Sequence, residues 1–471
     1  MTINVIGEID RLLRSAALDV LARRDRLSGW KLYRDAFLAS TRKDRESLAR
    51  DVESKLSRIL VHAYETSPYY RDAWKAIGFH PSPSFRSDDL QQLPFLTKDI
   101  IRDRTSLLVS ERFPSHELDL SYTGGTTGPP TSFYLDHACW VSRVGRQRGI
   151  LELCGYRPGT RRAFVWGVHA DLPPAGMKQT LKRWFREYAS SQEVLCCTLM
   201  TERMMMDYHT RLLRFRPKIL YGYPSAMAQL GSFMLERNLK PIRVKSIITT
   251  AERLTQTHRD VLQQVFGGEV FNLYCTREYG CIGFECGRHE GFHIDTESVF
   301  VEIIKNGRLA SHGESGEITI TDLQNYGMPF IRSRTGDVGA LSSQPCECGL
   351  PLPVLRRLDG RSTDFIYRPD GAMVPGLMFA DLFRDIPLIR YAQFVQEAVS
   401  ELDVLVVVTG ELTDGIKREA TRQVRELVGS DMTVRIKSVP EIARSPRSGK
   451  FREVICKISR REESHIARSQ V

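Results

Sequence analysis

The chain lacks any long hydrophobic run. Its most apolar stretches, residues 194–200 and 404–408, are far shorter than the roughly 20 residues that a membrane-spanning helix needs. The first 30 residues mix Asp and Glu with Arg, unlike a secretory signal peptide. We therefore expect no membrane span and no signal peptide, and we expect a cytoplasmic protein.

A regular cysteine framework is also missing. The 10 cysteines are spread irregularly over 471 residues, and only Cys346 and Cys348 form a close pair. This usage is typical of a reducing compartment rather than of a disulfide-stapled secreted domain. The 34 Gly and 22 Pro are dispersed, which excludes collagen-like and low-complexity chains.

No concentrated block of charge occurs, although the formal net charge is +10. Basic residues alternate with acidic ones, and no basic run is flanked by the aromatic residues that single-strand binders use. We therefore do not expect nucleic acid as a partner. The basic excess is compatible with small anionic substrates.

The length predicts one large domain and at least one smaller one. Apolar residues recur at helical spacing over residues 44–64, which predicts an amphipathic helix. Further along, short β-rich runs alternate with helical stretches, which indicates an α/β domain with parallel strands. The expected strands are 162–168, 218–221, 245–250, 269–274, 317–321 and 330–334, and the expected helices are 201–214 and 225–237.

A smaller α+β unit is expected after residue 360. Residues 391–399 and 403–409 have the pattern of a hairpin, 413–428 that of a helix and 432–439 that of a strand. We therefore predict a large domain over 1–360, with a helical part over about 1–100, and a small domain over 361–471.

The sharpest local signal is the segment SYTGGTTGPPT at residues 121–131. Its central residues are Thr123, Gly124, Gly125, Thr126, Thr127 and Gly128. Backbone N–H groups and hydroxyls in such a loop can surround phosphate oxygens. It is not a Walker loop, because no Gly-Lys-Ser/Thr follows. From composition alone, a plain polar turn remains the alternative.

Eight further motifs follow a fixed order around this loop. They are HAYETSPYYR (62–71), LPFLTK (93–98), GYPS (222–225), TAE (250–252), NLYCTRE (272–278), RTGD (334–337), GRSTD (360–364) and SGKFR (448–452). In this order the chain resembles the phenylacetate-CoA ligase-like branch of the acyl-adenylate-forming enzymes, including its capsule-biosynthesis relatives. The resemblance implies a large adenylate-forming domain with mixed and parallel sheets and a small mobile C-terminal domain.

The resemblance also implies roles in nucleotide binding. The Thr/Gly loop would hold the β- and γ-phosphates of ATP. Glu278 would bind Mg²⁺, which prefers carboxylate and phosphate oxygens. Asp337 would accept hydrogen bonds from both ribose hydroxyls. Ala251 and Glu252 would border the adenine, and Tyr274 would stack on its face.

Arg361 and Asp364 would mark the joint between the domains, with Asp364 as the hinge. Lys450 would neutralise charge at the carboxylate and the α-phosphate during adenylation. Taken alone, Lys450 could equally be part of an ordinary basic face. Two positions depart from the wider superfamily, because Arg277 replaces a Thr or Ser that touches phosphate and Pro129 replaces a Lys. We expect Arg277 to contact the α-phosphate instead.

A second constellation is independent of ATP. Cys286 is followed by His289 and His293, and Cys346 and Cys348 come later in a Pro-bracketed segment. Such thiols and imidazoles can hold tetrahedral zinc, although unrelated buried thiols are the alternative. Because some members of this branch carry zinc at matching positions, the resemblance implies a structural Zn²⁺ site, for which His293 fits better than His289.

The resemblance implies an ATP- and Mg²⁺-dependent ligase that forms an acyl-adenylate and passes the acyl group to a thiol, most naturally coenzyme A. Transfer to an amine or a hydroxyl is the first alternative, and a zinc-stabilised binding protein without catalysis is the second. Trp140, Tyr223 and Thr250 are the expected pocket residues, with core packing as the alternative for the aromatics. The sequence does not name the acid, and it leaves open whether the protein is a homodimer.

Overall fold

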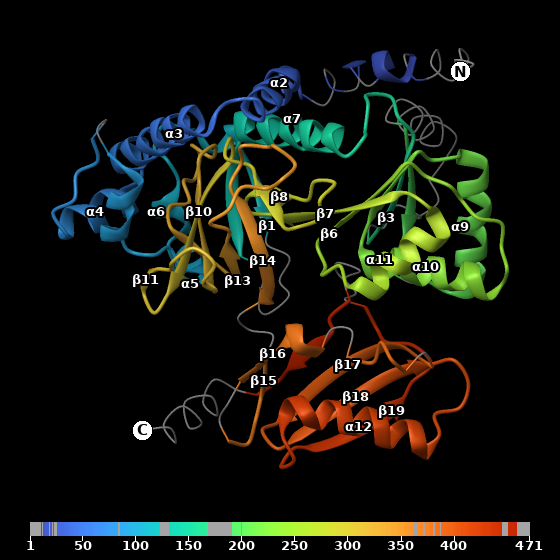
Figure 1. The fold of residues 1–471 in the computed structure, drawn as a ribbon. Coiled ribbons are helices and arrows are strands. Elements are labelled where there is room, and N and C mark those ends of the chain that lie inside the picture. The colour runs from blue at the N-terminus through green and yellow to red at the C-terminus, as the bar shows by residue number, and fades with distance from the viewer. Residues whose placement is uncertain are drawn as a thin grey trace.

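The structure is a computed structural model. It describes residues 11, 13–17, 19–20, 22, 26–82, 85–122, 131–167, 191–198, 200–361, 365–370, 373–379, 382–386, 388–444 and 451–458. Figure 1 shows a large unit, which ends near residue 361, and a small C-terminal unit beside it. Within these ranges, no helix combines the length and the apolar character that crossing a bilayer requires.

The large unit is built on a twelve-stranded sheet. Its parallel half follows the order β7-β6-β5-β3-β4, with bounds Glu269–Thr276, Ser246–Thr250, Ile219–Gly222, Arg162–Trp166 and Gln192–Cys196. The antiparallel half follows the order β11-β10-β12-β13-β14-β9-β8, with bounds Arg308–Leu309, Val299–Lys305, Gly316–Asp322, Ser333–Leu341, Val354–Arg361, Phe292–Ile294 and Gly280–Phe284. The two halves meet where β7 pairs with β8.

Helices cover both faces of the parallel half. Helices α9 (Glu202–Phe215), α10 (Pro224–Glu236) and α11 (Gln256–Phe266) pack on one face, over Val165, Leu220 and Ile247. On the other face lie α7 (His137–Leu153) and α2 (Trp30–Ser40), over Tyr221 and Ile248. In such sheets ligands bind beyond the carboxyl ends of the parallel strands, which here meet at one edge.

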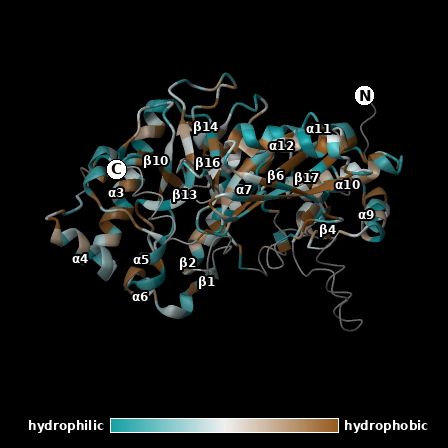
Figure 2. Cartoon of the chain, turned by 90° about the horizontal axis from the view of Figure 1, so that it is seen from below, coloured by the Kyte–Doolittle hydropathy of each residue, from teal (hydrophilic) through white to brown (hydrophobic). Residues whose placement is uncertain are grey.

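The N-terminal part packs on the antiparallel half. It contains α3 (Arg45–Thr66), α4 (Pro68–Ala76), α5 (Lys98–Asp103), α6 (Thr105–Leu108), the 3₁₀ turns η1 (Ser87–Gln92) and η2 (Ser115–Glu117), and the hairpin β1 (Leu118–Tyr122) and β2 (Ser132–Asp136). Asp44 caps α3 by accepting a hydrogen bond from the Ser47 N–H at 2.8 Å, so the helix expected near 44–64 is confirmed. Figure 2 shows hydrophilic and hydrophobic residues alternating along surface helices such as α5 and α6.

The small unit has a four-stranded sheet with the order β19-β18-β17-β20. Its elements are β15 (Phe365–Tyr367), β16 (Met373–Pro375), η3 (Gly376–Phe379), β17 (Ile389–Ala398), β18 (Glu401–Val408), α12 (Asp414–Val428), β19 (Thr433–Ser438) and β20 (Val454–Cys456). The hairpin, helix and strand predicted here are confirmed. The apolar face of α12, with Ala420, Val424 and Val428, is fully buried on this sheet.

The predicted α/β fold class with a small α+β unit is therefore confirmed. The strand expected over 330–334 is wrong in its first half, because β13 begins only at Ser333. Arg332 takes a left-handed φ of 49°, and its buried guanidinium binds Glu302 at 3.0 and 3.1 Å. This buried ion pair fixes a bend where the apolar pattern suggested a strand. The domain boundary at residue 360 stays a prediction.

Candidate active site

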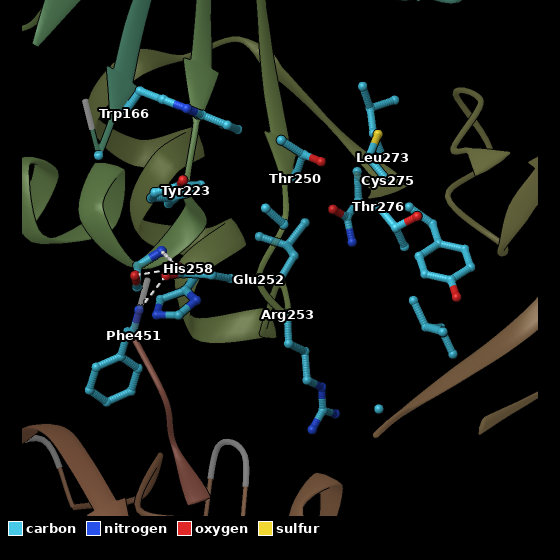
Figure 3. A pocket seen from close by; sticks show the side chains of 18 of the residues that line it. Trp166, Tyr223, Thr250, Glu252, Arg253, His258, Leu273, Cys275, Thr276 and Phe451 are labelled. Atoms are coloured by element: carbon cyan, nitrogen blue, oxygen red, sulfur yellow. Dashed lines mark hydrogen bonds between the residues drawn. The ribbon is translucent and has the colours of Figure 1, made fainter. Parts of the chain in front are cut away.

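A cavity of about 2000 Å³ opens beyond the carboxyl ends of the parallel strands and extends to the small unit. Nine residues predicted from the sequence line it: Trp140, Tyr223, Thr250, Ala251, Glu252, Tyr274, Arg277, Glu278 and Asp337. They come from separate motifs, so the fold brings the motifs together. Figure 3 shows Thr250, Glu252 and Thr276 around the cavity, with Phe451 of the small unit at its edge.

Tyr274 and Asp337 form one wall of the cavity. The Tyr274 hydroxyl donates a hydrogen bond to Asp337 Oδ2 at 2.6 Å, although the two residues lie on β7 and β13. Burial, and then the negative charge of Asp337, raise the pKa of Tyr274 well above its usual value. The phenol therefore stays protonated and keeps Asp337 oriented.

Arg277 and Glu278 lie in the turn between β7 and β8. Arg143 of α7 holds this turn through hydrogen bonds. The Arg143 guanidinium donates to the Arg277 carbonyl at 3.0 Å and also to the Glu278 carbonyl, and it pairs with Asp322 at 3.1 Å. Both ionic side chains of this pair are buried, at 8% and 3% exposure. Two carbonyls of one turn are thus fixed, while Arg277 is exposed and the side chain of Glu278 is half-buried at the cavity.

Glu252 links the large unit to the small one. Its carboxylate accepts hydrogen bonds from the Ser225 N–H at 3.3 Å and the Ser225 hydroxyl, and from the backbone N–H of Phe451. Arg444 donates to Ser225 Oγ at 2.8 Å and lies 3.8 Å from Glu252. We call these four residues the Glu252 contact. The side chains of Arg444 and Glu252 are 8% and 6% exposed, so water hardly screens their charges.

The turn that carries Glu252 has an unusual backbone. Ala251 adopts a left-handed φ of 67°, which is uncommon for a residue with a Cβ. The turn directly follows β6 and presents Ala251 at the cavity. Strained residues of this kind persist where the surrounding structure holds them, here by the hydrogen bonds of the neighbouring Glu252.

The expected pocket residues differ in exposure. Trp140 is 45% exposed, whereas Tyr223 and Thr250 are almost fully buried, at 3% and 1%. Trp166, which the sequence analysis did not single out, lies 4.4 Å from Tyr223 between ring centres and also lines the cavity. Its position at the end of β3 is the signal that could have identified it.

Several predicted residues lie outside the described ranges: the loop Thr123, Gly124, Gly125, Thr126, Thr127 and Gly128, then Pro129, Asp364 and Lys450. Ser121 and Thr131, on either side of the loop, line the cavity, as does Phe451 next to Lys450. Arg361 ends β14, where its backbone is paired with that of Asp337.

The predicted thiol cluster also comes together. Cys286, His293, Cys346 and Cys348 place one ligand atom each within 4.8 Å of one another. Cys286 Sγ lies 3.7 Å from Cys346 Sγ, close to the roughly 3.8 Å that two thiolates on one tetrahedral zinc would show. His293 Nε2 is 3.3 Å from Cys348 Sγ. His289 is outside this group, since it lies beside Glu285 and Glu269.

The chain is similar to known proteins over most of its length. The family described as the CapK C-terminal domain matches residues 366–457. Phenylacetate-coenzyme A ligase of Thermus thermophilus is 24% identical over 406 residues, which cover 83% of this chain and 86% of that protein. Protein CapK of Staphylococcus aureus is 23% identical over 382 residues, which cover 78% of this chain and 80% of CapK.

The fold is similar to that of 2-hydroxyisobutyryl-CoA ligase, in a crystal structure of the postadenylation state with R3-HIB-AMP. The TM-score is 0.73 at 19% sequence identity, and the match covers 91% of this chain and 93% of that chain. The same ligase in the thioesterification state reaches a TM-score of 0.59. The ordered motifs, the CapK C-terminal match and these relatives make the chain similar to phenylacetate-CoA ligases and CapK over most of its length.

Proposed function

We propose that this protein is an ATP-dependent, AMP-forming acid–CoA ligase. The observation that carries the proposal is the cavity itself, in which the Tyr274–Asp337 pair, the Arg277–Glu278 turn and the Glu252 contact meet. Each is suited to a different part of the reaction, and the small unit reaches the same cavity through Phe451.

In the first half-reaction, a carboxylate oxygen attacks the α-phosphorus of ATP and pyrophosphate leaves. Asp337 would anchor the ribose hydroxyls, and Ala251 and Tyr274 would border the adenine. Arg277, exposed at the cavity, would offset negative charge on the α-phosphate. Glu278 would hold Mg²⁺, which neutralises charge on the departing phosphates.

In the second half-reaction, the thiol of coenzyme A attacks the acyl carbon and loses its proton, and AMP leaves. No covalent bond to the enzyme is needed. The two half-reactions require different surroundings at the same acyl group. We therefore expect the small unit to change its position between the first half-reaction and the second. The Glu252 contact would hold it in the adenylation arrangement.

The experiment that tests this function is pyrophosphate exchange with ATP over a panel of aryl, fatty and hydroxy acids, followed by mass spectrometry of products formed with coenzyme A. Acid-dependent exchange with a CoA thioester supports the proposal. Exchange without a thioester would favour an amine or a hydroxyl as the acyl acceptor. If no acid supports exchange, the proposal fails and a binding protein is favoured.

The Glu252 contact gives a prediction specific to the first half-reaction. Arg444→Met should lower pyrophosphate exchange about tenfold, because a charge-assisted contact of two buried groups is worth on the order of 1.5–3 kcal/mol. Transfer from chemically prepared acyl-adenylate to coenzyme A should stay near the wild-type rate, measured as thioester formation.

Arg384→Met is the matched control. Arg384 also bridges the two units, to Asp260 at 3.2 Å, but both side chains are about half exposed. Exposed pairs contribute little, so exchange should barely change. Equal losses in the two variants would show that any weakening of the interface has this effect, and the role given to Arg444 would be wrong.

We further propose a structural zinc ion held by Cys286, His293, Cys346 and Cys348. Three thiol sulfurs and one imidazole nitrogen are the donor set that closed zinc sites use. Bound there, zinc would tie the chain after β8, strand β9 and the loop between β13 and β14 into one structure. It would have no open coordination position, which suits a structural role.

Zinc should copurify at about one atom per chain, as elemental analysis would measure. His293→Gln, or Cys346→Ser combined with Cys348→Ser, should lose the metal and lower the melting temperature by several degrees, because metal binding contributes to folding stability. His289→Gln should keep it, since His289 lies outside the cluster. A metal-free protein of full stability would contradict the site.

A further inference from the structure

The cavity continues well beyond the adenylate region, along helix α7. The residues of α7 that line it form one stripe: Trp140, Arg143, Val144, Gln147, Arg148 and Leu151. From Trp140 to Arg148 the helix rises about 12 Å. A substrate that begins at the reacting carboxylate near Thr250 and Tyr223 would extend toward Arg148 past the point where Gln147 Nε2 donates to the Tyr221 hydroxyl at 3.3 Å.

The opposite wall is the sheet face beneath α7. Alternate residues Arg162, Phe164 and Trp166 of β3 line the cavity, because successive strand side chains point to opposite faces. Gln192 of β4 is in register with Arg162, and Tyr221 of β5 is in register with Phe164. The cavity therefore runs from the polar adenylate region, past aromatic rings, to a second polar end.

Two arginines meet at this second end. Arg162 is only 7% exposed, and its Cζ atom lies 4.7 Å from the Tyr156 ring centre and 5.3 Å from that of Phe164. The Cζ atom of Arg148 lies 4.0 Å from the Trp30 ring centre. Within the described part of the chain, Arg162 Nε and Arg148 Nη1 are buried without a hydrogen-bond partner.

Three carboxylates near this end, among the described residues, face other cations, although Glu152 Oε1 has no hydrogen-bond partner there. Asp19 pairs with Lys31 at 2.7 Å, Glu152 faces Arg34 at 3.5 Å, and Glu193 pairs with Arg211. Burial lowers the pKa of Arg148, and the positive charge of Arg162 lowers it further. Burying two like charges with free donors is costly unless an anion joins them.

We propose that the acid activated by this protein carries a second anionic group at its far end, bound by Arg148 and Arg162. This inference rests on the proposed ligase function and specifies its substrate class. A guanidinium presents a planar fork of N–H donors, which suits a carboxylate, a sulfate or a phosphate ester. The aromatic middle of the cavity would contact an apolar linker of about 12 Å between the two ends.

The test compares matched acids in the pyrophosphate-exchange assay. An α,ω-dicarboxylic acid, the monocarboxylic acid of equal length and an acid with a terminal phosphate ester are assayed over lengths that bracket the cavity. The wild-type protein should prefer one of the doubly charged acids by tenfold or more in kcat/KM, as expected for charge-assisted hydrogen bonds. The better of the two identifies the anion.

Arg162→Gln and Arg148→Gln should each reduce this preference about tenfold. The preference is the ratio of two kcat/KM values measured on one preparation, so even a partly unfolded variant still reports it. Thermal melting shows whether each variant is folded. Arg157→Gln, which alters an exposed arginine nearby, should keep the preference.

If monocarboxylic acids support exchange as well as or better than the doubly charged acids of equal length, the inference is overturned. The ligase function would stay intact. An unchanged preference in both arginine variants would also overturn it and would assign these side chains to packing on aromatic rings. Absence of exchange with every acid would instead contradict the ligase function itself.

Discussion

Asp337→Ala should raise the KM for ATP by about a hundredfold while a saturating concentration of ATP restores much of the rate. A carboxylate that accepts hydrogen bonds from two ribose hydroxyls gains about 1.5–3 kcal/mol from each. Asp337 is 8% exposed, so water cannot readily take over these contacts. Initial rates over a range of ATP concentrations, at saturating acid, measure the effect.

Tyr274→Phe is the control for this variant. It removes the phenol that donates to Asp337 Oδ2 but keeps the carboxylate and an aromatic ring. The KM for ATP should change only a few fold, because an ordinary hydrogen bond contributes about 1 kcal/mol. If Tyr274→Phe and Asp337→Ala raised KM equally, Asp337 would be acting through the tyrosine, and the ribose assignment would be wrong.

Much of the candidate site could be predicted because its chemistry is concentrated in short motifs. Tyr274, Arg277 and Glu278 lie within five residues of each other in the sequence, and Asp337 is marked by its Arg-Thr-Gly turn. The thiol cluster was predicted from the family resemblance, because the cysteine and histidine spacing alone left unrelated buried thiols as the alternative. The fold then brings Tyr274, Arg277, Glu278 and Asp337 to one cavity.

The contacts that position these residues could not be predicted, because they join distant parts of the chain. Arg143 reaches a turn 134 residues away, and in the sequence it is one arginine among many on a helix. Glu252 was expected beside the adenine, yet its carboxylate binds Ser225 and the backbone of Phe451. Arg162 is a further case, because its burial depends on the packing of α7 over β3.

Periodicity predicted the helices α3, α9, α10 and α12, and it failed where a buried charge determines the backbone. The apolar run at 330–331 was expected to begin a strand. Instead, the ion pair of Arg332 with Glu302 and the hydrogen bond from its guanidinium to the Leu93 carbonyl, at 2.6 Å, hold a left-handed residue there. A sequence pattern contains no information about that partner.

Lys450→Ala should depress pyrophosphate exchange by two orders of magnitude or more, about the scale for removing a positioned charge from developing negative charge. Arg444 and Phe451, which flank the segment containing Lys450, are both bound to the large unit through the Glu252 contact. Because both flanking residues contact the large unit, we expect Lys450 to act at the cavity during adenylation. Once the small unit turns to admit coenzyme A, the lysine should no longer be needed.

Separate assays of the two half-reactions distinguish the role of Lys450 from that of the hinge. Supplied with chemically prepared acyl-adenylate, Lys450→Ala should form the thioester at close to the wild-type rate. Asp364→Pro should give the reverse, with exchange largely kept and transfer lost, because proline fixes φ at the predicted hinge. The pyrophosphate-exchange rate of Arg444→Met should fall between those of the wild type and Lys450→Ala. This variant weakens the Glu252 contact next to the segment that contains Lys450, but it keeps the charge of Lys450. Equal loss of both half-reactions in Lys450→Ala, or no loss, would show that this lysine does not serve adenylation.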